Sequence, residues 1–327
     1  MGQMENKKIL IISLLSLVVS IGLIAILFSQ TDSSQFKHLL DNINLNQYLI
    51  AFLIYVFINL IIAFRLCYFY KIKDGKSILA SLDIGASHAV ALCVLPLRLG
   101  DAIYPFLIKR YLNKSLVSSL HNLFVLRVYD FISAVIIFLM LLLNTVFITK
   151  VSPLSYAFLV LSILISYVLL KNLVQILSLF INMFNKLGFT GIALKLRAMS
   201  DRFEKDSQKL STKSHLYIFT FSIVRWVFSG LMLLHLCYAL NLDIELGQAL
   251  FLTTGMNMAF IIPLQTVGGI GVLESVLALL ITMQGLPFER ASAMAISLRL
   301  LWFTLPFILG FIWFSGRKLC KRLSFSH

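Results

Sequence analysis

The sequence predicts an all-α polytopic membrane protein, and three observations lead to this fold class. Hydrophobic residues make up 59% of the chain and charged residues 13%, with a mean hydropathy of +0.92, a composition that excludes a soluble domain. Most Lys and Arg residues stand in short loops beside apolar runs. Two further apolar segments are interrupted by Pro, Gly and an acid, a pattern typical of the broken helices of transporters.

Six uninterrupted apolar segments are about long enough to cross a bilayer, which takes about 20 residues of helix. They cover residues 9–28, 48–70, 119–148, 154–170, 216–240 and 291–315. The first follows Lys7 and Lys8 and lacks a small-x-small cleavage site, so we interpret it as an uncleaved signal anchor. The loop charges predict a multi-pass protein of the plasma (inner) membrane with cytoplasmic N- and C-termini. The net charge of +14 therefore reflects topology, and we expect no nucleic-acid partner.

The longest polar stretch, residues 182–214, is too short to fold around a core of its own. We therefore expect a single multipass transmembrane domain over residues 1–327. From residue 185 the stretch predicts an amphipathic cytoplasmic helix, because apolar residues recur at helical spacing opposite basic ones. The apolar stripe is Ile192, Leu196, Met199, Phe203 and Leu210. This helix either lies on the anionic inner leaflet or is a polar connector with one docked face.

The two interrupted segments share one order of residues. The first has apolar halves at residues 78–95 and 103–108, and the second at 249–262 and 272–284. Between the halves stand Pro96, Arg98, Gly100 and Asp101 in the first, and Pro263, Gly268, Gly269, Gly271 and Glu274 in the second. Proline removes a backbone donor and glycine exposes backbone, so such a break is tolerated at membrane depth only beside protein or a wet cavity.

The neighbouring charges place the opening of the first element on the cytoplasmic side and that of the second outside. The sequence therefore predicts inverted-topology repeats at about residues 75–148 and 245–315, each with a broken or re-entrant helical hairpin. Whether each hairpin is re-entrant or crosses fully stays open at this stage. In the re-entrant interpretation, Pro96 and Pro263 lie near the bilayer midplane, related by a pseudo-two-fold axis.

Several arginines fall within the predicted membrane segments, namely Arg65, Arg98, Arg127, Arg225 and Arg299. A charge at mid-bilayer costs about 2.5–3.5 kcal/mol, so each needs a partner or water. Arg65 lies near a span end, from which it can reach the interface. Asp130 follows Arg127 by three residues, which favours a local salt bridge. Arg225 and Arg299 have no acid one turn away, and their planar guanidinium suits a phosphate.

Glu274 falls in the first turn after Gly271, where the half-helix presents its N-terminal amides and attracts anions. It is either a helix cap or the residue that holds Arg299 or Arg225 for a lipid phosphate.

The sequence contains no known catalytic motif and no cluster of metal-ligand residues. His88 and His235 stand alone on apolar helices, and the cysteines Cys67, Cys93, Cys237 and Cys320 are scattered. We expect no cofactor, no metal and no enzymatic activity. An intramembrane transferase using Asp101 or Glu274 stays open but has little support.

Two motifs resemble one known family. PLRLGDAIYPFLIKRYLNKSLVSSLHNLFVLRVYDF resembles the pattern P-x-R-x-G-[DE] followed by E-R-x-x-D, and IPLQTVGGIGVLE resembles P-x-x-G-G-x-G-x-x-E, of the lysylphosphatidylglycerol synthase transmembrane (flippase-like) family. The chain departs from the pattern at Val125 and Leu126, which precede Arg127 where an acid is usual, and at Pro105, where a basic residue is frequent. The resemblance implies a lipid-translocating domain like the flippase half of the multiple peptide resistance factor. It gives functional weight to Arg98, Gly100, Asp101, Arg127, Asp130, Gly268, Gly269, Gly271, Glu274 and Arg299.

The sequence thus predicts a flippase or transporter that moves an anionic, aminoacylated or polyprenyl-linked (glyco)lipid across the plasma membrane. The predicted substrate-binding residues are Arg98, Asp101, Arg127, Asp130, Arg225, Gly268, Gly269, Gly271, Glu274 and Arg299. The partner is a membrane lipid with an anionic headgroup, and a homo-oligomer stays open. The alternative is a non-catalytic membrane scaffold subunit for an envelope-biosynthesis enzyme that makes polysaccharide or glycolipid.

Overall fold

The computed structural model describes residues 18, 21–31, 33–95, 99–143, 153–186, 189–208, 210–258, 266 and 269–324. These residues form helices joined by short connections, with no strand among them, so the predicted all-α fold is confirmed. In order, the helices are α2 (Ser33–Asp41), α3 (Leu45–Phe69), α4 (Gly75–Val94), α5 (Leu99–Leu112), α6 (Leu116–Leu143), α7 (Pro153–Lys171), α8 (Leu173–Lys186), α9 (Thr190–Gln208), α10 (Thr212–Ala239), α11 (Leu246–Met258), α12 (Val272–Thr282) and α13 (Phe288–Ser324).

Side-chain caps determine where several helices begin. The Asn44 carboxamide oxygen accepts a hydrogen bond from the Asn46 amide at the start of α3, at 3.1 Å. The Asp74 carboxylate does the same for Ser77 in α4, at 2.9 Å. Such caps satisfy backbone donors that the first helical turn leaves without a partner.

Helices α3, α4, α6, α10 and α13 are long and apolar enough to cross a membrane. Helices α7 and α8 form a pair bent by 75° that could count as one more span. A multi-pass membrane protein is therefore confirmed. The predicted first span, residues 9–28, lies mostly outside the described residues, although residues 21–28 are helical.

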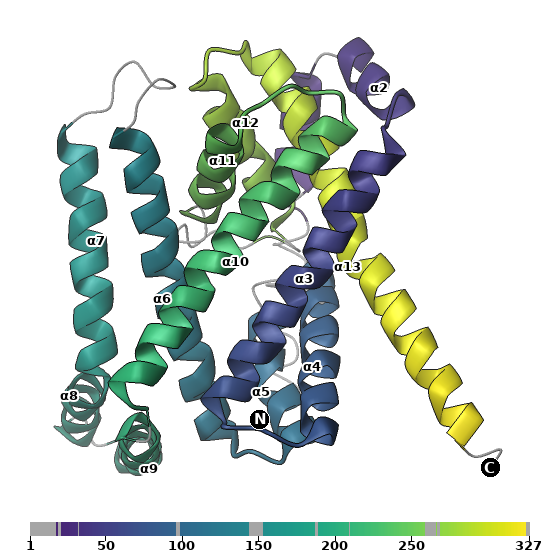
Figure 1. The fold of residues 1–327 in the computed structure, drawn as a ribbon. Coiled ribbons are helices and arrows are strands. Elements are labelled where there is room, and N and C mark those ends of the chain that lie inside the picture. Colours follow the sequence, from purple (N-terminus) through teal and green to yellow (C-terminus); the bar gives the residue numbers. More distant parts are fainter. Residues whose placement is uncertain are drawn as a thin grey trace.

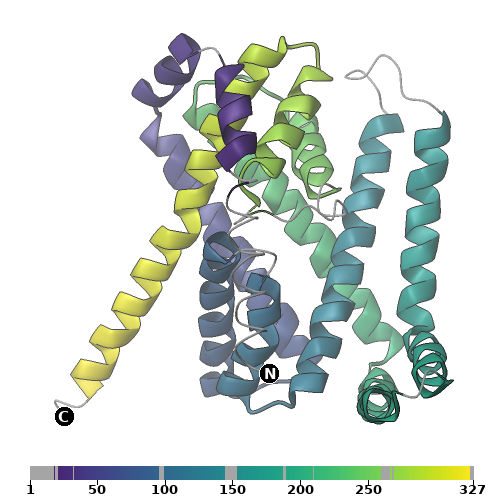
Figure 2. The ribbon, with the colours of Figure 1, turned by 180° about the vertical axis from the view of Figure 1, so that it is seen from behind.

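The two hairpins lie at opposite ends of the molecule. Helices α4 and α5 occupy the lower half in Figure 1, and the chain enters and leaves them at the lower end. Helices α11 and α12 occupy the upper half in both views (Figures 1 and 2). With 11 residues, α12 rises about 16 Å, well short of the roughly 30 Å hydrocarbon core. Pro96 and Pro263 lie outside the described residues, so their midplane position and the symmetry of the repeats stay predictions.

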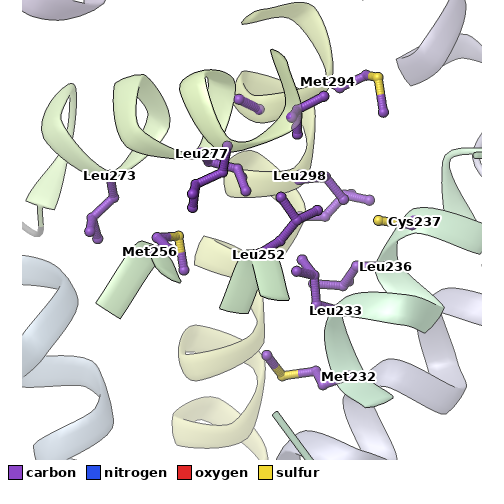
Figure 3. Packing of buried hydrophobic residues seen from close by; sticks show 14 of the residues in the cluster. Met232, Leu233, Leu236, Cys237, Leu252, Met256, Leu273, Leu277, Met294 and Leu298 are labelled. Atoms are coloured by element: carbon purple, nitrogen blue, oxygen red, sulfur yellow. The ribbon is translucent and has the colours of Figure 1, made fainter. Parts of the chain in front are cut away.

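Buried apolar side chains of α10, α11, α12 and α13 form a core near the second hairpin (Figure 3). Leu236 of α10, Leu277 of α12 and Leu298 of α13 have no exposed surface there. Lipid tails are as apolar as leucine, so this packing stabilises the helix contacts through close van der Waals fit. The core fixes α12 against α13, and with it the acid of the second hairpin.

The amphipathic segment begins earlier than predicted. Helix α8 starts at Leu173, directly after the 75° bend, and a second helix, α9, follows from Thr190. The amphipathic helix predicted within residues 185–214 is α9, and α8 is an additional helix that was not predicted because the apolar run continues past Lys171 and hides the bend. On α9, Phe203 is buried and its ring lies 5.1 Å from that of His121 on α6. One face of α9 is therefore docked on the bundle.

Candidate functional site

The first hairpin brings one carboxylate to two helices. Asp101 lies in the first turn of α5, and its Oδ1 accepts a hydrogen bond from Arg127 of α6. The same oxygen lies 3.3 Å from Nε2 of His88 on α4. Gly100 allows this approach, since a Cβ there would lie 2.7 Å from the Leu92 Cα. The short contact of α5 with α4 thus places Asp101 between an imidazole and a guanidinium.

Arg127 is half exposed although it lies deep in the bundle. Its side chain is 46% exposed, and its position is about 16 Å along α6 from Leu116 at 1.5 Å per residue. A guanidinium that faced lipid at this depth would cost several kcal/mol. The exposed part of Arg127 therefore needs water or a polar group beside it.

Asp130 joins three helices. Its carboxylate lies 2.8 Å from Arg65 Nη1 of α3 and 3.3 Å from Arg225 Nη2 of α10. The predicted Arg127–Asp130 salt bridge is wrong, because Arg127 turns to α5 while Asp130 faces α3 and α10. The prediction that Arg65 reaches the interface is wrong too, since only 2% of its side chain is exposed. The Nε atoms of Arg65 and Arg225 are buried and have no partner among the described residues.

The second hairpin carries a matching pair. Glu274 Oε1 accepts a hydrogen bond from Arg299 Nε of α13 at 3.1 Å, and its Oε2 accepts one from the Gly271 amide at 2.7 Å. Glu274 therefore caps the helix and also contacts Arg299, so the contacts of both predicted alternatives are present. Gly269 and Gly271 adopt φ of 75° and 86°, a left-handed conformation that favours glycine. The Arg299 side chain is 8% exposed.

The charged groups of the first site lie on neighbouring helices. Asp130 lies beside Arg65 and Arg225, and Asp101 lies beside Arg127. The arrangement presents arginines at several depths, each beside a carboxylate. Such a set can bind an anionic oxygen-rich group such as a phosphate.

Comparison with known families shows where the chain belongs. Residues 13–310 match the family described as "Lysylphosphatidylglycerol synthase TM region". The chain belongs to this family. UPF0104 membrane protein MJ1078 of Methanocaldococcus jannaschii is 26% identical over 221 residues, which cover 68% of this chain and 91% of that protein. No solved structure matches the chain. The resemblance drawn from the two motifs is thus confirmed.

In this member of the lysylphosphatidylglycerol synthase TM region family, most of the motif residues lie in or beside the paired charges. Asp101 with Arg127, and Glu274 with Arg299, are in direct contact. Arg225 joins them through Asp130. The predicted site residues Arg98 and Gly268 lie outside the described residues.

Besides the partners of Asp130, sequence reasoning missed the partners of Asp83 and of Asp101. Asp83 of α4 is buried and accepts hydrogen bonds from Trp313 Nε1 and Arg317 Nη2 of α13, both at 2.7 Å. The sequence did carry a sign of this ion pair, because Asp83 is a lone acid within an apolar helix and such an acid needs a partner. His88, interpreted as a core residue, contacts Asp101 thirteen residues further along the chain.

Proposed function

We propose that the protein is a lipid flippase or transporter, with no enzymatic activity of its own, that moves a lipid with an anionic headgroup across the plasma membrane. The observation that carries the proposal is that each hairpin pairs its acid with an arginine on the next helix. Asp101 holds Arg127, and Glu274 holds Arg299. A headgroup phosphate can replace the carboxylate on such an arginine because both offer anionic oxygens to the same planar donors.

The two pairs differ in access. Arg127 is 46% exposed and Arg299 8%, so a headgroup can reach the first arginine in this conformation and not the second. A carrier needs such a difference, because a site open to both sides would let ions leak. For the lipid to cross, Arg127 must become buried and Arg299 must become exposed.

The orientation follows from the basic residues. Lys71, Lys109 and Lys114 surround the open end of the first hairpin, and α8 and α9 lie at the same end (Figure 1). Cytoplasmic loops are enriched in Lys and Arg, so this end faces the cytoplasm in our proposal. The cargo classes considered are simple anionic, aminoacylated and polyprenyl-linked lipids.

Reconstituted vesicles test the proposal. Fluorescent anionic lipid is placed in both leaflets, and a membrane-impermeant quencher reports how fast inner-leaflet lipid reaches the outside. We expect faster exposure with the protein than in protein-free vesicles, and loss of this gain in Arg127→Gln. Lys195→Gln, at an exposed residue of α9, is the matched control and keeps the gain. No gain with any anionic or polyprenyl lipid would contradict the proposal.

A second candidate is the scaffold role, which the surface of α8 favours. Leu179 is 68% exposed and Phe180 and Met183 are exposed beside it, an apolar face that a partner protein could cover. Substitution of Leu179, Phe180 and Met183 with serine separates the two functions. A stable envelope-biosynthesis partner that is lost in this variant, while lipid movement persists, favours a scaffold role in addition to transport.

A further inference from the structure

One carboxylate oxygen at the first hairpin has two nitrogen neighbours. Asp101 Oδ1 accepts a hydrogen bond from Arg127 Nη2 and lies 3.3 Å from His88 Nε2. The His88 side chain is 10% exposed and that of Asp101 24%. Arginine is always charged in proteins, whereas histidine is the residue that gains or loses a proton near neutral pH. Asp101 therefore lies between a permanent cation and a group that becomes a cation when it takes a proton.

Lipid binding in the proposed function removes the permanent cation from Asp101. A headgroup phosphate that takes Arg127 leaves a largely buried carboxylate within the membrane, where an unpaired charge is costly. The carboxylate then needs a new counter-charge. His88 already lies at the same oxygen, so a proton on its ring supplies that charge without a new partner for Asp101.

The groups that face His88 belong to the first hairpin and the helix that follows it. From α5 it faces Asp101 and also Tyr104, whose ring centre lies 4.8 Å from its own. Arg127 of α6 reaches it through Asp101. Helices α3 and α13 also pack on α4, but their arginines contact other acids. These pairs are Arg65 with Asp130, Arg299 with Glu274 and Arg317 with Asp83.

The proton and the lipid favour each other at this site. While Arg127 holds Asp101, a second positive charge at the same carboxylate oxygen would be repelled by the first. Departure of Arg127 to a phosphate removes this repulsion and leaves the anion in place beside His88. Each of the two ligands, the phosphate and the proton, therefore binds more tightly when the other is present.

We propose that the protein takes up a proton with each lipid. The headgroup phosphate binds Arg127, one proton from water binds His88, and Asp101 exchanges its guanidinium partner for the imidazolium. The proton offsets the negative charge of the headgroup, so the loaded site carries the same net charge as the empty one. The inference rests on the proposed function and adds a second ligand to its site.

Arg98 is the rival counter-charge for Asp101. It stands three residues before Asp101 in the sequence and lies outside the described residues. If Arg98 replaced Arg127 at the carboxylate, lipid would bind without a proton. An amine on the headgroup would have the same effect, so the test uses a headgroup that has none.

Calorimetry in buffers of different ionisation enthalpy counts the protons taken up with each lipid. Dihexanoylphosphatidylglycerol, whose phosphodiester does not titrate near neutral pH, is added to the purified full-length protein in detergent at several values between about pH 6 and 8. We expect uptake that approaches about one proton per lipid within this range. Because the lipid favours the protonated site, its Kd should rise with pH, by up to about tenfold per pH unit.

Three variants assign the proton. His88→Gln keeps a side-chain donor for Asp101 but takes no proton, so uptake should disappear and the weakened lipid binding should no longer change with pH. Asp101→Asn removes the anion that holds the proton, so uptake should also disappear, while lipid binds more tightly because Arg127 has no competing carboxylate. His235→Gln is the matched control, since Nδ1 of His235 contacts Gln47 Oε1 at 2.7 Å, and it should take up protons as the unmodified protein does.

The outcomes separate this inference from the proposed function. Lipid binding without proton uptake at any of these pH values would overturn the inference, while lipid movement in vesicles would leave the proposed function standing. Uptake that persists in His88→Gln or Asp101→Asn, or that is lost in His235→Gln, would also overturn it. Uptake is counted per bound lipid, so a loss of folded protein does not change the ratio. If the lipid neither binds nor moves in vesicles, the proposed function fails and the inference falls with it.

Discussion

Gly100→Ala tests the short contact that positions Asp101. A Cβ at Gly100 would lie 2.7 Å from the Leu92 Cα, 2.8 Å from its amide nitrogen and 2.9 Å from the Ala91 carbonyl carbon. These are backbone atoms, so α5 has to move from α4 by about 0.7 Å to restore an ordinary contact of about 3.4 Å. Such overpacking costs about 1–3 kcal/mol. We expect lower thermal stability and weaker binding of anionic lipid, because the 3.3 Å approach of His88 to Asp101 is lost.

Gly85→Ala is the matched control on α4. A Cβ there would meet only the Asn59 carbonyl oxygen at 3.8 Å, and alanine is favoured over glycine in a helix by about 1 kcal/mol. The control should be as stable as the unmodified protein or more so. The unfolding temperatures of both variants in detergent, together with their calorimetric lipid affinities, test whether the packing of α5 on α4 positions Asp101. If Gly100→Ala unfolds at the same temperature and binds lipid unchanged, the close packing of α5 on α4 does not hold Asp101 in place.

Three further predictions concern the charges. Asp130→Asn should lower the free energy of unfolding by about 3–5 kcal/mol, because Arg65 and Arg225 would lose their shared counter-charge. A thermal stability close to that of the unmodified protein would mean that water compensates the charges of both arginines. Glu274→Gln should lower stability by about 3 kcal/mol and abolish transport per folded molecule in the vesicle assay; normal transport would reduce Glu274 to a helix cap. The Ser77 side chain and amide hold the pKa of Asp74 below its usual range, so the cap on α4 is intact above about pH 4 and is lost as the pH falls through the lowered pKa. Hydrogen exchange at the Ser77 amide should therefore speed up in acid, and Asp74→Asn, which cannot be protonated in this range, should not show the change.

Hydropathy and loop charge were sufficient to predict the all-α fold and most of the spans. Breaks by proline and glycine located both hairpins, because few other sequences interrupt an apolar run in that order. The bend at Asn172 was not predictable in this way. Apolar residues continue on both sides of it, and only the change from a uniformly apolar helix to an amphipathic one marks α8.

The candidate site was predictable where the partners lie in one repeat. A contact of Glu274 with Arg299 or Arg225 was one of two alternatives, and the structure shows the contact with Arg299. The partner of Asp130 was predicted wrongly, because spacing along one helix says which residues are neighbours on its surface and nothing about other helices. Its true partners, Arg65 and Arg225, are brought to it by the packing of α3 and α10 around α6. Hydropathy likewise did not show that Arg65 faces the interior.

The central claim is that both hairpin arginines are needed to move a lipid, although only one is accessible in this conformation. The most direct measurement compares Arg127→Gln with Arg299→Gln in two assays, calorimetric binding of dihexanoylphosphatidylglycerol and lipid movement in vesicles. We predict that both variants lose lipid movement and that only Arg127→Gln loses binding. Lipid movement at the unmodified rate in Arg299→Gln, measured per folded molecule, would contradict the account.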